Sequence, residues 1–369
     1  MVSLFSFIMM SMSCFRASRL PLGALRRSYS RSNLVMQPEG PEVASLADSL
    51  NQRLGTTKSW YNPIITPEAS SDNNSSAIVR LKNVNIISGR YTKKKPEGWE
   101  ILQEHLQKTS AGLHLSDIKT KGKFIYFTFV SHPDLSLWST LGLAGGWTFQ
   151  SHRHTRLKLT FEIERMDNNG ITEIISLYFF DTRNFGTFKV SNQRTELEGK
   201  LRKLGIDWLS KDPENRVTLS QFVELGKAAA KRGRPLAVFL MDQSKTAGIG
   251  NYLLSEVLYV SKIHPFALCA SLDNESWEGL YVAIRDTIQC SYFSQTQLDG
   301  VFHESEKLLS GRDNFTDYSK FEFIIYAQQY TRDTKDKVVR QEGAHKRTIH
   351  WVPSIQIKHA PESFHVIQR

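Results

Sequence analysis

The sequence has few cysteines, a shortage of acidic residues and no long apolar run. Its three cysteines (Cys14, Cys269 and Cys290) cannot form a disulfide framework, and no two have metal-ligand spacing. A reducing compartment is therefore the default. The apolar segment 4–12 is too short to span a membrane. The 37 acidic residues face 47 lysines and arginines, and the resulting formal net charge of +10 suits a protein that binds a polyanion.

Residues 1–37 differ in composition from the rest of the chain. They contain five arginines, eight serines and no acidic residue. This composition is typical of an organelle transit peptide, so we expect a presequence that is removed in a mitochondrion or plastid, with the nucleus as the alternative location. A secretory or bipartite signal and a disordered basic tail stay open, although no basic residue precedes the apolar segment. Without the five arginines the formal charge falls from +10 to +5.

Short β-type runs dominate residues 78–190. The runs 123–130 and 174–180 are rich in Val, Ile, Phe, Tyr and Thr, which favour strands. Many such runs with turn signals between them predict a two-sheet β-sandwich. The pattern also predicts an amphipathic helix over 43–54 and a polar loop over 70–77.

The apolar period changes from two to 3.6 after Thr218. Thr218 and Gln221 have the spacing of a capping box, which predicts a helix that continues to Ala229. The further helices predicted are 236–247, 251–261 and 275–290. A polar break follows at 307–319, and the segments 321–330 and 337–356 are predicted to form a small β-hairpin unit.

We therefore predict an α+β protein, with an N-terminal β-sandwich flanked by helices and a C-terminal helical domain that carries the hairpin unit. A hydrophobic content of 40% is enough for two domains with cores of their own. The predicted parts are a presequence (1–37), a β-sandwich domain (38–190), a linker (191–217), a helical domain (218–310), a hairpin unit (311–357) and a tail (358–369).

The segment 241–258 predicts two helices joined by a glycine-containing turn. Gly248 and Gly250 allow a tight turn and a close approach of another backbone. Asn251 stands where a helix N-cap is expected, ahead of Tyr252. Free amides at such a helix start suit a phosphate. A plain helical hairpin would give the same pattern, so this segment alone does not establish a function.

A second segment carries a family resemblance. Residues 36–43 read Met-Gln-Pro-Glu-Gly-Pro-Glu-Val, which resembles the start of the formamidopyrimidine-DNA glycosylase and endonuclease VIII family, whose mature N-terminus reads Pro-Glu-Gly-Pro-Glu. Residues 241–258 resemble the helix–two-turn–helix motif of the same family. The resemblance runs in order from about Pro38 to Gln356. It implies a bifunctional DNA glycosylase and abasic-site lyase of base excision repair, acting on damaged double-stranded DNA.

The resemblance implies four catalytic or supporting residues. Pro38 would be the nucleophile, because an α-amino group has a pKa near 8 and is partly unprotonated at neutral pH. Glu39 would protonate the opening sugar ring, with Glu42 as a supporting carboxylate. Lys123 matches a hairpin lysine that binds a phosphate and assists catalysis. Taken without the resemblance, these residues fit an ordinary helix start and a solvated strand-edge lysine.

Other residues match the DNA-binding positions of the family. The stretch 141–145 resembles Leu-Gly-Met-Ser-Gly and places Leu143 where an intercalating methionine stands. In the stretch 181–186, which resembles Asp-Pro-Arg-Arg-Phe-Gly, Arg183 would face the orphaned base and Phe185 would wedge the stack. An ordinary turn with a core phenylalanine is the alternative. The positions matching backbone-contacting residues of the family are His154 and Asn251.

The C-terminal unit departs from the zinc-binding members of the family. Val352 and Ile355 stand in the place of the second Cys-x-x-Cys pair, and no cysteine follows Cys290. A structural zinc site of that type is therefore not expected. Arg347 is retained at the DNA-contacting position of the hairpin. The unit resembles a zincless finger, in which apolar packing replaces the metal.

Two further departures bear on activity. Ala237 stands where the purine-repair branch has a lysine, which favours oxidised pyrimidines, formamidopyrimidines and hydantoins as substrates over 8-oxoguanine. Gln37 precedes Pro38, and an acylated proline nitrogen cannot attack a sugar. Activity therefore requires cleavage between Gln37 and Pro38.

The sequence leaves two rival hypotheses for function. A chain whose proline stays blocked would be a DNA-binding protein that recognises lesions or abasic sites without cleaving them. A protein that uses only the helical motif would bind RNA or ribosomes. For the enzyme we expect a monomer with no diffusible cofactor, no metal and no membrane partner.

Overall fold

The computed structural model describes residues 38–56, 77–165, 172–210, 216–296 and 321–362. These residues all belong to one compact unit that begins at Met36. Three predicted segments lie outside the described residues. They are the presequence 1–37, all but the last residue of the loop 70–77, and the polar break 307–319. Within the described ranges, no helix has the length and apolar character needed to cross a membrane. The predicted domain boundaries stay predictions.

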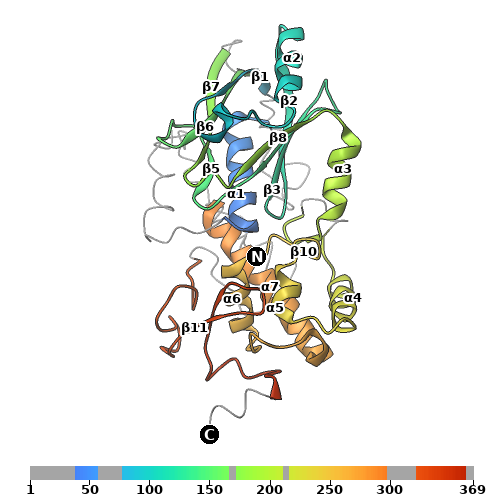
Figure 1. Cartoon of the computed structure of the whole chain (residues 1–369), viewed down its shortest axis with the longest axis vertical. Helices are drawn as coiled ribbons and strands as arrows, with labels where there is room; N and C mark the ends of the chain where they lie inside the picture. Colours follow the sequence, from blue (N-terminus) through green and yellow to red (C-terminus); the bar gives the residue numbers. More distant parts are fainter. Residues whose placement is uncertain (1–37, 57–76, 166–171, 211–215, 297–320, 363–369) are drawn as a thin grey trace, which may run out of the picture. The chain divides into compact units, whose positions relative to one another are not determined.

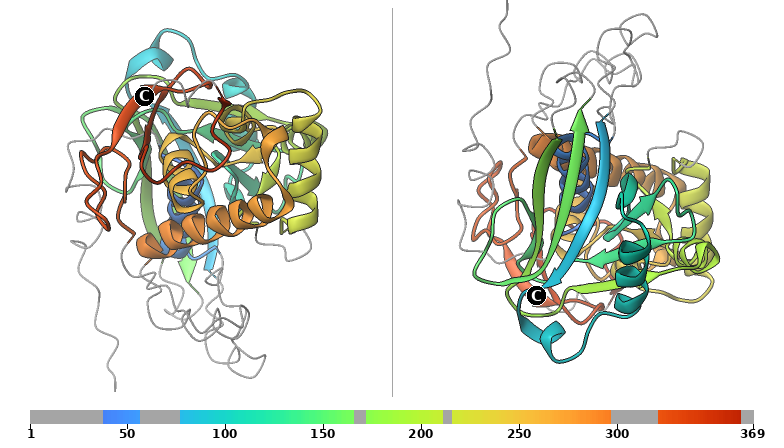
Figure 2. Two further views of the ribbon diagram at one scale, coloured as in Figure 1. Left: turned by 90° about the horizontal axis from the view of Figure 1, so that it is seen from below. Right: turned by 90° about the horizontal axis from the view of Figure 1, so that it is seen from above.

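Eight antiparallel strands form the main sheet (Figures 1 and 2), in the order β5-β7-β6-β1-β2-β3-β4-β8. Alternating burial along β6 and β3 places their apolar side chains on one face. The strands are β1 (Ala77–Ile86), β2 (Leu113–Lys121), β3 (Phe124–Phe129), β4 (Ser136–Thr140), β5 (Gly145–Thr148), β6 (Thr155–Arg165), β7 (Thr172–Asp181) and β8 (Thr187–Ser191).

The two halves of this sheet enclose one core. Trp147 on β5 lies with its ring 5.5 Å from Phe127 on β3, 5.1 Å from Phe179 on β7 and 6.1 Å from Phe188 on β8. Strands β5 and β7, from one end of the strand order, therefore face β3 and β8, from the other half, across these rings. The prediction of an α+β fold is confirmed. The predicted β-sandwich has two separate sheets, whereas in the structure β1 pairs with β2. This pairing joins the two halves into one continuous sheet.

Helix α1 (Gly40–Leu54) completes this core. Its buried face includes Val43, Leu50 and Leu54, as an amphipathic helix requires. The side chain of Asn51 donates to the carbonyl of Ile118 (2.7 Å) and accepts from the amide of the same residue (3.0 Å), which joins the helix to β2. The C-terminal part of α1 is thereby fixed relative to the sheet.

The second half of the chain is mainly helical. Thr218 caps α4 in a capping box with Gln221, as predicted. The predicted helix 236–247 is wrong beyond Met241, because Thr246 and Ala247 form β10, which pairs in parallel with β9. The remaining helices and short strands are α2 (Trp99–Lys108), α3 (Arg194–Lys203), β9 (Ile206–Asp207), α4 (Leu219–Ala230), α5 (Leu236–Met241), β10 (Thr246–Ala247), α6 (Asn251–Val260) and α7 (Asn274–Thr296), with 3-10 turns η3 (Gly89–Thr92) and η5 (Cys269–Ser271).

A β-hairpin forms the C-terminal unit, from β11 (Val339–Glu342) and β12 (Thr348–Trp351). It lies within the predicted segment 337–356, whereas the predicted strand segment 321–330 contains no strand. Val352 is fully buried and packs with Tyr259, Ile325 and Val338, and Ile355 packs against this cluster. The two residues that replace the cysteine pair are therefore part of an apolar cluster.

A buried carboxylate also holds this unit. Glu256 on α6 is 1% exposed and accepts hydrogen bonds from the amides of Ile324 (2.9 Å), Ile325 (3.1 Å) and Tyr326 (2.8 Å). Burial raises the pKa of Glu256 to about 7, while the three amide hydrogen bonds oppose that shift. The carboxylate thus fixes the beginning of the C-terminal unit on α6.

Replacing Glu256 with alanine should destabilise the protein strongly. The change leaves one buried and two partly buried amides without an acceptor, so we expect the free energy of unfolding to fall by about 3 kcal/mol. Urea denaturation measures it. The control is Glu224→Ala at an exposed position on α4, which should change it by less than about 0.5 kcal/mol. Equal losses in the two variants would contradict the anchoring role of Glu256.

Candidate active site

The carboxylate of Glu39 binds the beginning of α6. Its oxygens accept hydrogen bonds from the amides of Gly250 (2.7 Å), Tyr252 (3.0 Å) and Leu253 (3.3 Å). Pro38 and Glu39 are both buried just before α1. Because a helix N-terminus is partly positive, it stabilises a carboxylate there. A residue 211 positions away thus satisfies the free amides of this helix.

This contact corrects two predictions about the turn at 248–251. Gly250 is the N-cap of α6, and Asn251 is its first residue rather than its cap. The three amides expected to bind a phosphate are bound to Glu39 instead. A phosphate at this helix start would have to compete with a carboxylate of the same chain.

Lys123 lies beside the same carboxylate. It occupies the turn between β2 and β3, and its Nζ donates to the carbonyl of Ile249 (3.0 Å). A Cβ built on Gly250 would lie 2.2 Å from Glu39 Cδ and 2.5 Å from Lys123 Nζ, so both groups rest against the Cα of this glycine. Only a residue without a side chain allows that approach.

Both charged groups of this pair have shifted pKa values. Burial raises the pKa of Glu39 to about 7, while the charge of Lys123 opposes the shift and that of Glu42 adds to it. Burial lowers the pKa of Lys123, against the opposing charge of Glu39, and nearby Arg347 lowers it further. A carboxyl group that titrates near neutral pH can both donate and accept a proton under physiological conditions.

Glu42 connects this centre to two helices. Its Oε2 accepts from the amide of Glu39 (2.9 Å). Its Oε1 accepts from the hydroxyl groups of Tyr252 (2.7 Å) and Ser291 (3.2 Å) and from the side-chain amide of Gln295 (3.0 Å). The turn at Pro38 and Glu39 is therefore held from α6 and α7.

Asn251 and Arg347 bring the C-terminal hairpin to this site. Asn251 Nδ2 donates to the carbonyl of Thr348 (2.8 Å), and its Oδ1 lies 3.0 Å from Nε2 of His345. Arg347 is exposed in the hairpin turn. Its charge lowers the pKa values of Lys123 and His345, in both cases after burial as the larger cause. The structure thus groups Arg347 with Lys123, although they are far apart in sequence.

The loop 181–186 is organised around a buried carboxylate. Asp181 accepts from the amides of Arg183 (3.0 Å), Asn184 (3.0 Å) and Gly186 (2.5 Å). Arg183 and Phe185 project into solvent, and Phe185 is 64% exposed. Phe185 is therefore an exposed aromatic ring on a firmly held loop, and the alternative of a core phenylalanine is excluded.

The loop that carries Leu143 lies against the loop 181–186. Thr182 Oγ1 donates to the carbonyl of Ala144 (3.1 Å), and a Cβ on Gly142 would lie 2.7 Å from the amide of Gly186. Leu143 is half-buried. The structure therefore brings Leu143 together with Arg183 and Phe185.

His154 lies at the base of these loops. Its carbonyl accepts from the amide of Asp181 (3.1 Å), and its half-buried ring lies 5.4 Å from that of His152. Strand register places the loops near Lys123, because Phe124 pairs with Thr140 and Thr140 pairs with Thr187. These predicted site residues therefore lie at one end of the sheet.

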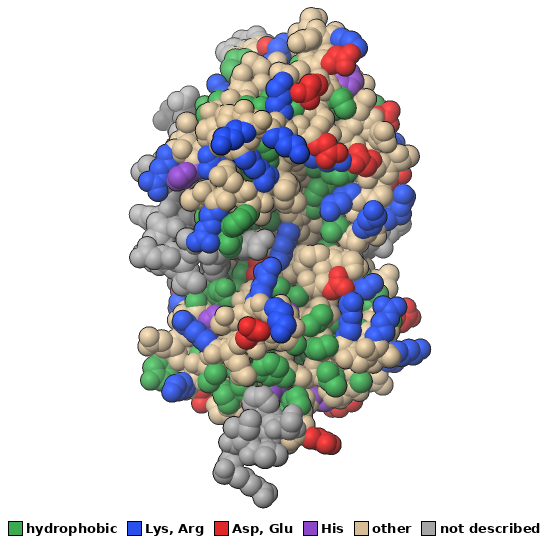
Figure 3. All heavy atoms as spheres, viewed as in Figure 1, with side chains coloured by type: hydrophobic (Ala, Val, Ile, Leu, Met, Phe, Trp, Pro, Cys, Tyr) green, Lys and Arg blue, Asp and Glu red, His purple; other side chains and the backbone are tan. Residues whose placement is uncertain are grey.

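The face shown in Figure 3 is rich in basic side chains, which lie over both the sheet and the helical part. Within the described ranges, no group of three or more His, Cys, Asp or Glu side chains is arranged to hold a metal ion. The local chemistry is therefore that of a buried acid and a buried amine beside basic surface groups.

Two family models match the chain, and each covers part of this site, whereas Pro38, Glu39, Glu42 and Arg347 lie outside both matches. The formamidopyrimidine-DNA glycosylase N-terminal domain matches residues 74–188, and the formamidopyrimidine-DNA glycosylase H2TH domain matches residues 209–297. Together they span more than half of the 369 residues. The chain belongs to the formamidopyrimidine-DNA glycosylase and endonuclease VIII family. The resemblance inferred from the sequence is confirmed.

Formamidopyrimidine-DNA glycosylases from several organisms are also similar to this chain in sequence. The protein of Thermus thermophilus is 30% identical over 178 residues, which are 48% of this chain and 59% of that protein. That of Ligilactobacillus salivarius is 27% identical over 244 residues, 63% of this chain and 79% of that protein. The match to the Thermus relative thus spans about three fifths of its length.

Solved structures of the family share the fold. The Lactococcus lactis enzyme, non-covalently bound to DNA containing an AP site, has a TM-score of 0.59 and 18% sequence identity, with 87% of this chain and all of that chain covered. The Thermus thermophilus enzyme has a TM-score of 0.57 and 21% identity, with 88% and 100% covered.

The family sequence pattern does not reveal all of the site. Sequence reasoning missed Tyr252, whose amide binds Glu39 and whose hydroxyl binds Glu42. It also missed Arg156, a buried arginine that donates twice to the carbonyl of Asp181 and once to Ser88. The apolar alternation of β6 gives no warning of Arg156, because its guanidinium is buried by contacts with Ser88 and Asp181 of other segments.

The raised pKa of Glu39 predicts a pH dependence of stability. The folded state keeps this proton up to about pH 7, whereas the unfolded state loses it near 4.5. This group therefore adds stability that is fully present below pH 4.5 and is lost as the pH rises to about 7. Relative to Glu39→Gln, the free energy of unfolding of the unaltered protein should fall by about 3 kcal/mol across that window. Urea denaturation from pH 4.5 to 7.5 measures this difference, and parallel pH profiles for the two proteins would refute it.

Proposed function

We propose that this protein is a bifunctional DNA glycosylase and abasic-site lyase that removes oxidised bases in base excision repair. The observation that carries the proposal is the buried Glu39 carboxylate with its neighbours. It lies next to Pro38 in the chain, against Lys123 in space, and has a pKa of about 7. Base release and elimination require an amine that acts as nucleophile and an acid that can donate its proton near neutral pH.

The proposed reaction begins at Pro38 once the bond between Gln37 and Pro38 has been cleaved. The freed secondary amine attacks C1′ of the damaged nucleotide, the bond from C1′ to the base breaks, and the departing base takes up the proton that the amine nitrogen loses. Glu39 donates its proton to the ring oxygen as the sugar opens. The product is an iminium ion in which the nitrogen of Pro38 is bonded to C1′.

Strand cleavage follows from this iminium ion. Its positive charge acidifies the hydrogens on C2′, and loss of one of them expels the 3′ phosphate, then the 5′ phosphate after a second proton loss. Water finally hydrolyses the iminium and frees Pro38. Lys123 would bind a phosphate beside the sugar, since the charge of Glu39 opposes the lowering of its pKa by burial and favours the ammonium form. Glu42 would hold the amide of Glu39 in place.

The exposed loops suit the DNA that remains after a nucleotide has been flipped out. Leu143 would fill the vacated space, Arg183 would face the orphaned base and Phe185 would wedge the stack. His154 and Arg347 would contact the phosphate backbone. Asn251 would act through the hairpin turn that its side chain binds, in addition to any contact with DNA.

Substrate range and setting are parts of the same proposal. Ala237 is fully buried on α5 and supplies no cation toward a base, which favours oxidised pyrimidines, formamidopyrimidines and hydantoins as substrates. The apolar cluster around Val352 supports a zincless finger. We propose that the enzyme acts as a monomer in a mitochondrion or plastid, with the nucleus as the alternative.

A second candidate function is a lesion- or abasic-site DNA-binding protein without catalysis. The observation that favours it is the peptide bond that joins Gln37 to Pro38 in the full chain. While that bond is intact the proline nitrogen is acylated and cannot attack C1′. The loops and basic groups described above would still bind damaged DNA.

The proposed roles of Pro38 and Glu39 can be tested with protein whose N-terminus is a free Pro38. We expect it to release the base from duplexes with an oxidised pyrimidine and to cleave the strand. Pro38→Gly should slow base release about tenfold or more, and Glu39→Gln should abolish it. Gel assays under single-turnover conditions measure both steps. Full activity of Glu39→Gln would rule out the role given to this carboxylate.

The wedge role of Phe185 predicts a selective loss of affinity. Phe185→Ala should weaken binding to an abasic-site duplex about tenfold, while binding to intact duplex stays the same, because only the damaged duplex has a gap to fill. Ile174→Ala is a matched control, since Ile174 on β7 is 61% exposed. Fluorescence anisotropy with both duplexes measures the effect, and similar losses for Phe185→Ala and Ile174→Ala would count against a wedge.

A further inference from the structure

A cavity of about 540 Å³ lies beside the candidate active site, between the segment 90–97 and the strands β3, β4 and β8. Its lining includes five cationic side chains and one carboxylate, and Lys200 of α3 closes one side. These charged residues are Arg90, Lys94, Lys95, Lys189, Lys200 and Glu97. The excess of positive charge favours an anionic ligand.

Nearly buried aromatic rings lie beneath three of the cations that line this cavity. The Arg90 guanidinium lies 4.9 Å from the ring centre of Tyr91. Lys200 Nζ lies 5.5 Å from that of Phe124, and Lys189 Nζ lies 5.0 Å from that of Trp138. The rings attract these cations through their π electrons and so help to position them at the cavity.

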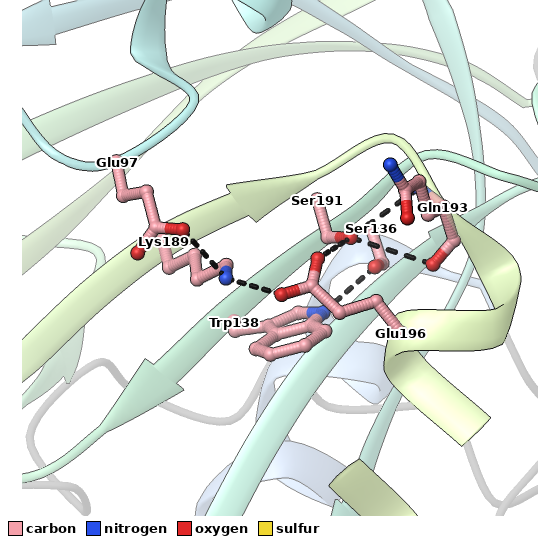
Figure 4. Close-up of polar contacts among 7 residues, drawn as sticks. All are labelled: Glu97, Ser136, Trp138, Lys189, Ser191, Gln193 and Glu196. Carbon is pink, nitrogen blue, oxygen red and sulfur yellow. Dashed lines mark hydrogen bonds and ion pairs between the residues drawn. The ribbon is translucent and has the colours of Figure 1, made fainter. Parts of the chain in front are cut away.

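A polar network fixes one wall of the cavity (Figure 4). Lys189 lies between Glu97 (2.7 Å) and Glu196, and Ser191 donates to Glu196 (2.5 Å). Glu196 is one helical turn before Lys200, so the network ties α3 to β8 and places Lys200 over the cavity. Trp138 is fixed by a hydrogen bond to Ser136 (2.7 Å). The cavity is therefore built from side chains held in place.

Two of the cavity lysines are available to a ligand. Lys94 and Lys200 form no salt bridge with any residue in the described ranges, and Lys94 is exposed. Lys95 pairs with Glu100 (3.2 Å) at the surface. A phosphate group entering the cavity would therefore meet two lysines without a competing carboxylate.

The cavity adjoins the exposed loop 181–186. Arg90 donates to the carbonyls of Asn184 (3.1 Å) and Gly186. Thr187, the next residue, lines the cavity together with Phe124, which follows Lys123 in the chain. A ligand here would lie behind the loop that carries Phe185, on the β4–β8 side of the sheet.

We propose that this cavity binds a nucleotide by its phosphate group, which Lys94 and Lys200 would hold. A basic groove binds the phosphate of a nucleotide whatever base it carries. The nucleotide comes either as a free 5′-monophosphate or as part of an unpaired DNA end. This site does not depend on the chemistry proposed for Pro38.

The test compares two double variants with equal loss of charge. Lys94→Ala with Lys200→Ala removes the two available cations of the cavity. Lys93→Ala with Lys203→Ala is the control, because Lys93 is exposed within the segment 90–97 and Lys203 is exposed on α3, but neither lines the cavity. Folding of both is checked by thermal unfolding. Trp138 is left unchanged because its hydrogen bond is part of the wall.

The probes separate the two sources of the nucleotide. Calorimetry measures binding of thymidine 5′-monophosphate and of thymidine, and anisotropy measures binding of abasic-site duplexes with blunt ends or with a 5′ single-stranded overhang. We expect the cavity variant to bind the monophosphate or the overhang duplex at least tenfold more weakly than the control variant. Loss with the monophosphate identifies a free nucleotide, and loss confined to the overhang duplex identifies a strand end.

Two results would overturn the proposal. One is equal binding by both variants in all arms, and the other is an equal loss in both, which would show unspecific attraction to the basic surface. Cleavage of the blunt abasic-site duplex by protein with a free Pro38 is measured in parallel. Because cleavage does not use the cavity lysines, failure of the catalytic proposal and failure of this one give different results.

Discussion

The hydrogen bonds between the Glu39 carboxylate and the amides of Gly250, Tyr252 and Leu253 are the interaction on which the site depends. They join the residue before α1 to the start of α6, across 211 positions of sequence. Burying a carboxylate costs several kcal/mol unless hydrogen bonds and a nearby cation compensate. Here three amides and the neighbouring Lys123 provide that compensation. The residual imbalance leaves the pKa near 7, so the contact that assembles the site also sets the proton affinity of its acid.

Helix α6 carries a second interaction of the same kind. Near its other end, Glu256 accepts from the three amides of residues 324–326, and its pKa is likewise about 7. One helix therefore receives a carboxylate from the N-terminal turn and extends a carboxylate to the C-terminal unit. Through that unit the hairpin carrying Arg347 is held against Asn251. Buried hydrogen bonds and the apolar cluster around Val352 thus hold the C-terminal unit together.

Local sequence signals predicted the elements that local forces determine. The capping box at Thr218 and the helix over 43–54 depend on neighbouring residues, and the structure contains both. The predictions that were wrong concern long-range contacts. The helix predicted over 236–247 ends at Met241 because Thr246 and Ala247 pair with β9. Asn251 is not the cap of α6, since a distant carboxylate binds the amides that a cap would satisfy. No periodicity in the sequence records either contact. The family resemblance named the site residues, but only the fold shows that Lys123 and Glu39 share the surface of Gly250.

The central claim is that Pro38 is a free N-terminus in nature and that its amine attacks abasic sites beside Glu39 and Lys123. Borohydride trapping on abasic-site DNA, with protein purified from its own cells, tests this claim most directly, because reduction fixes the iminium as a stable covalent bond. We predict an adduct that peptide mapping places on Pro38 as the first residue. Absence of an adduct, together with retained binding to abasic-site DNA, would contradict the proposed enzymatic activity. That result would support a DNA-binding protein whose proline stays blocked.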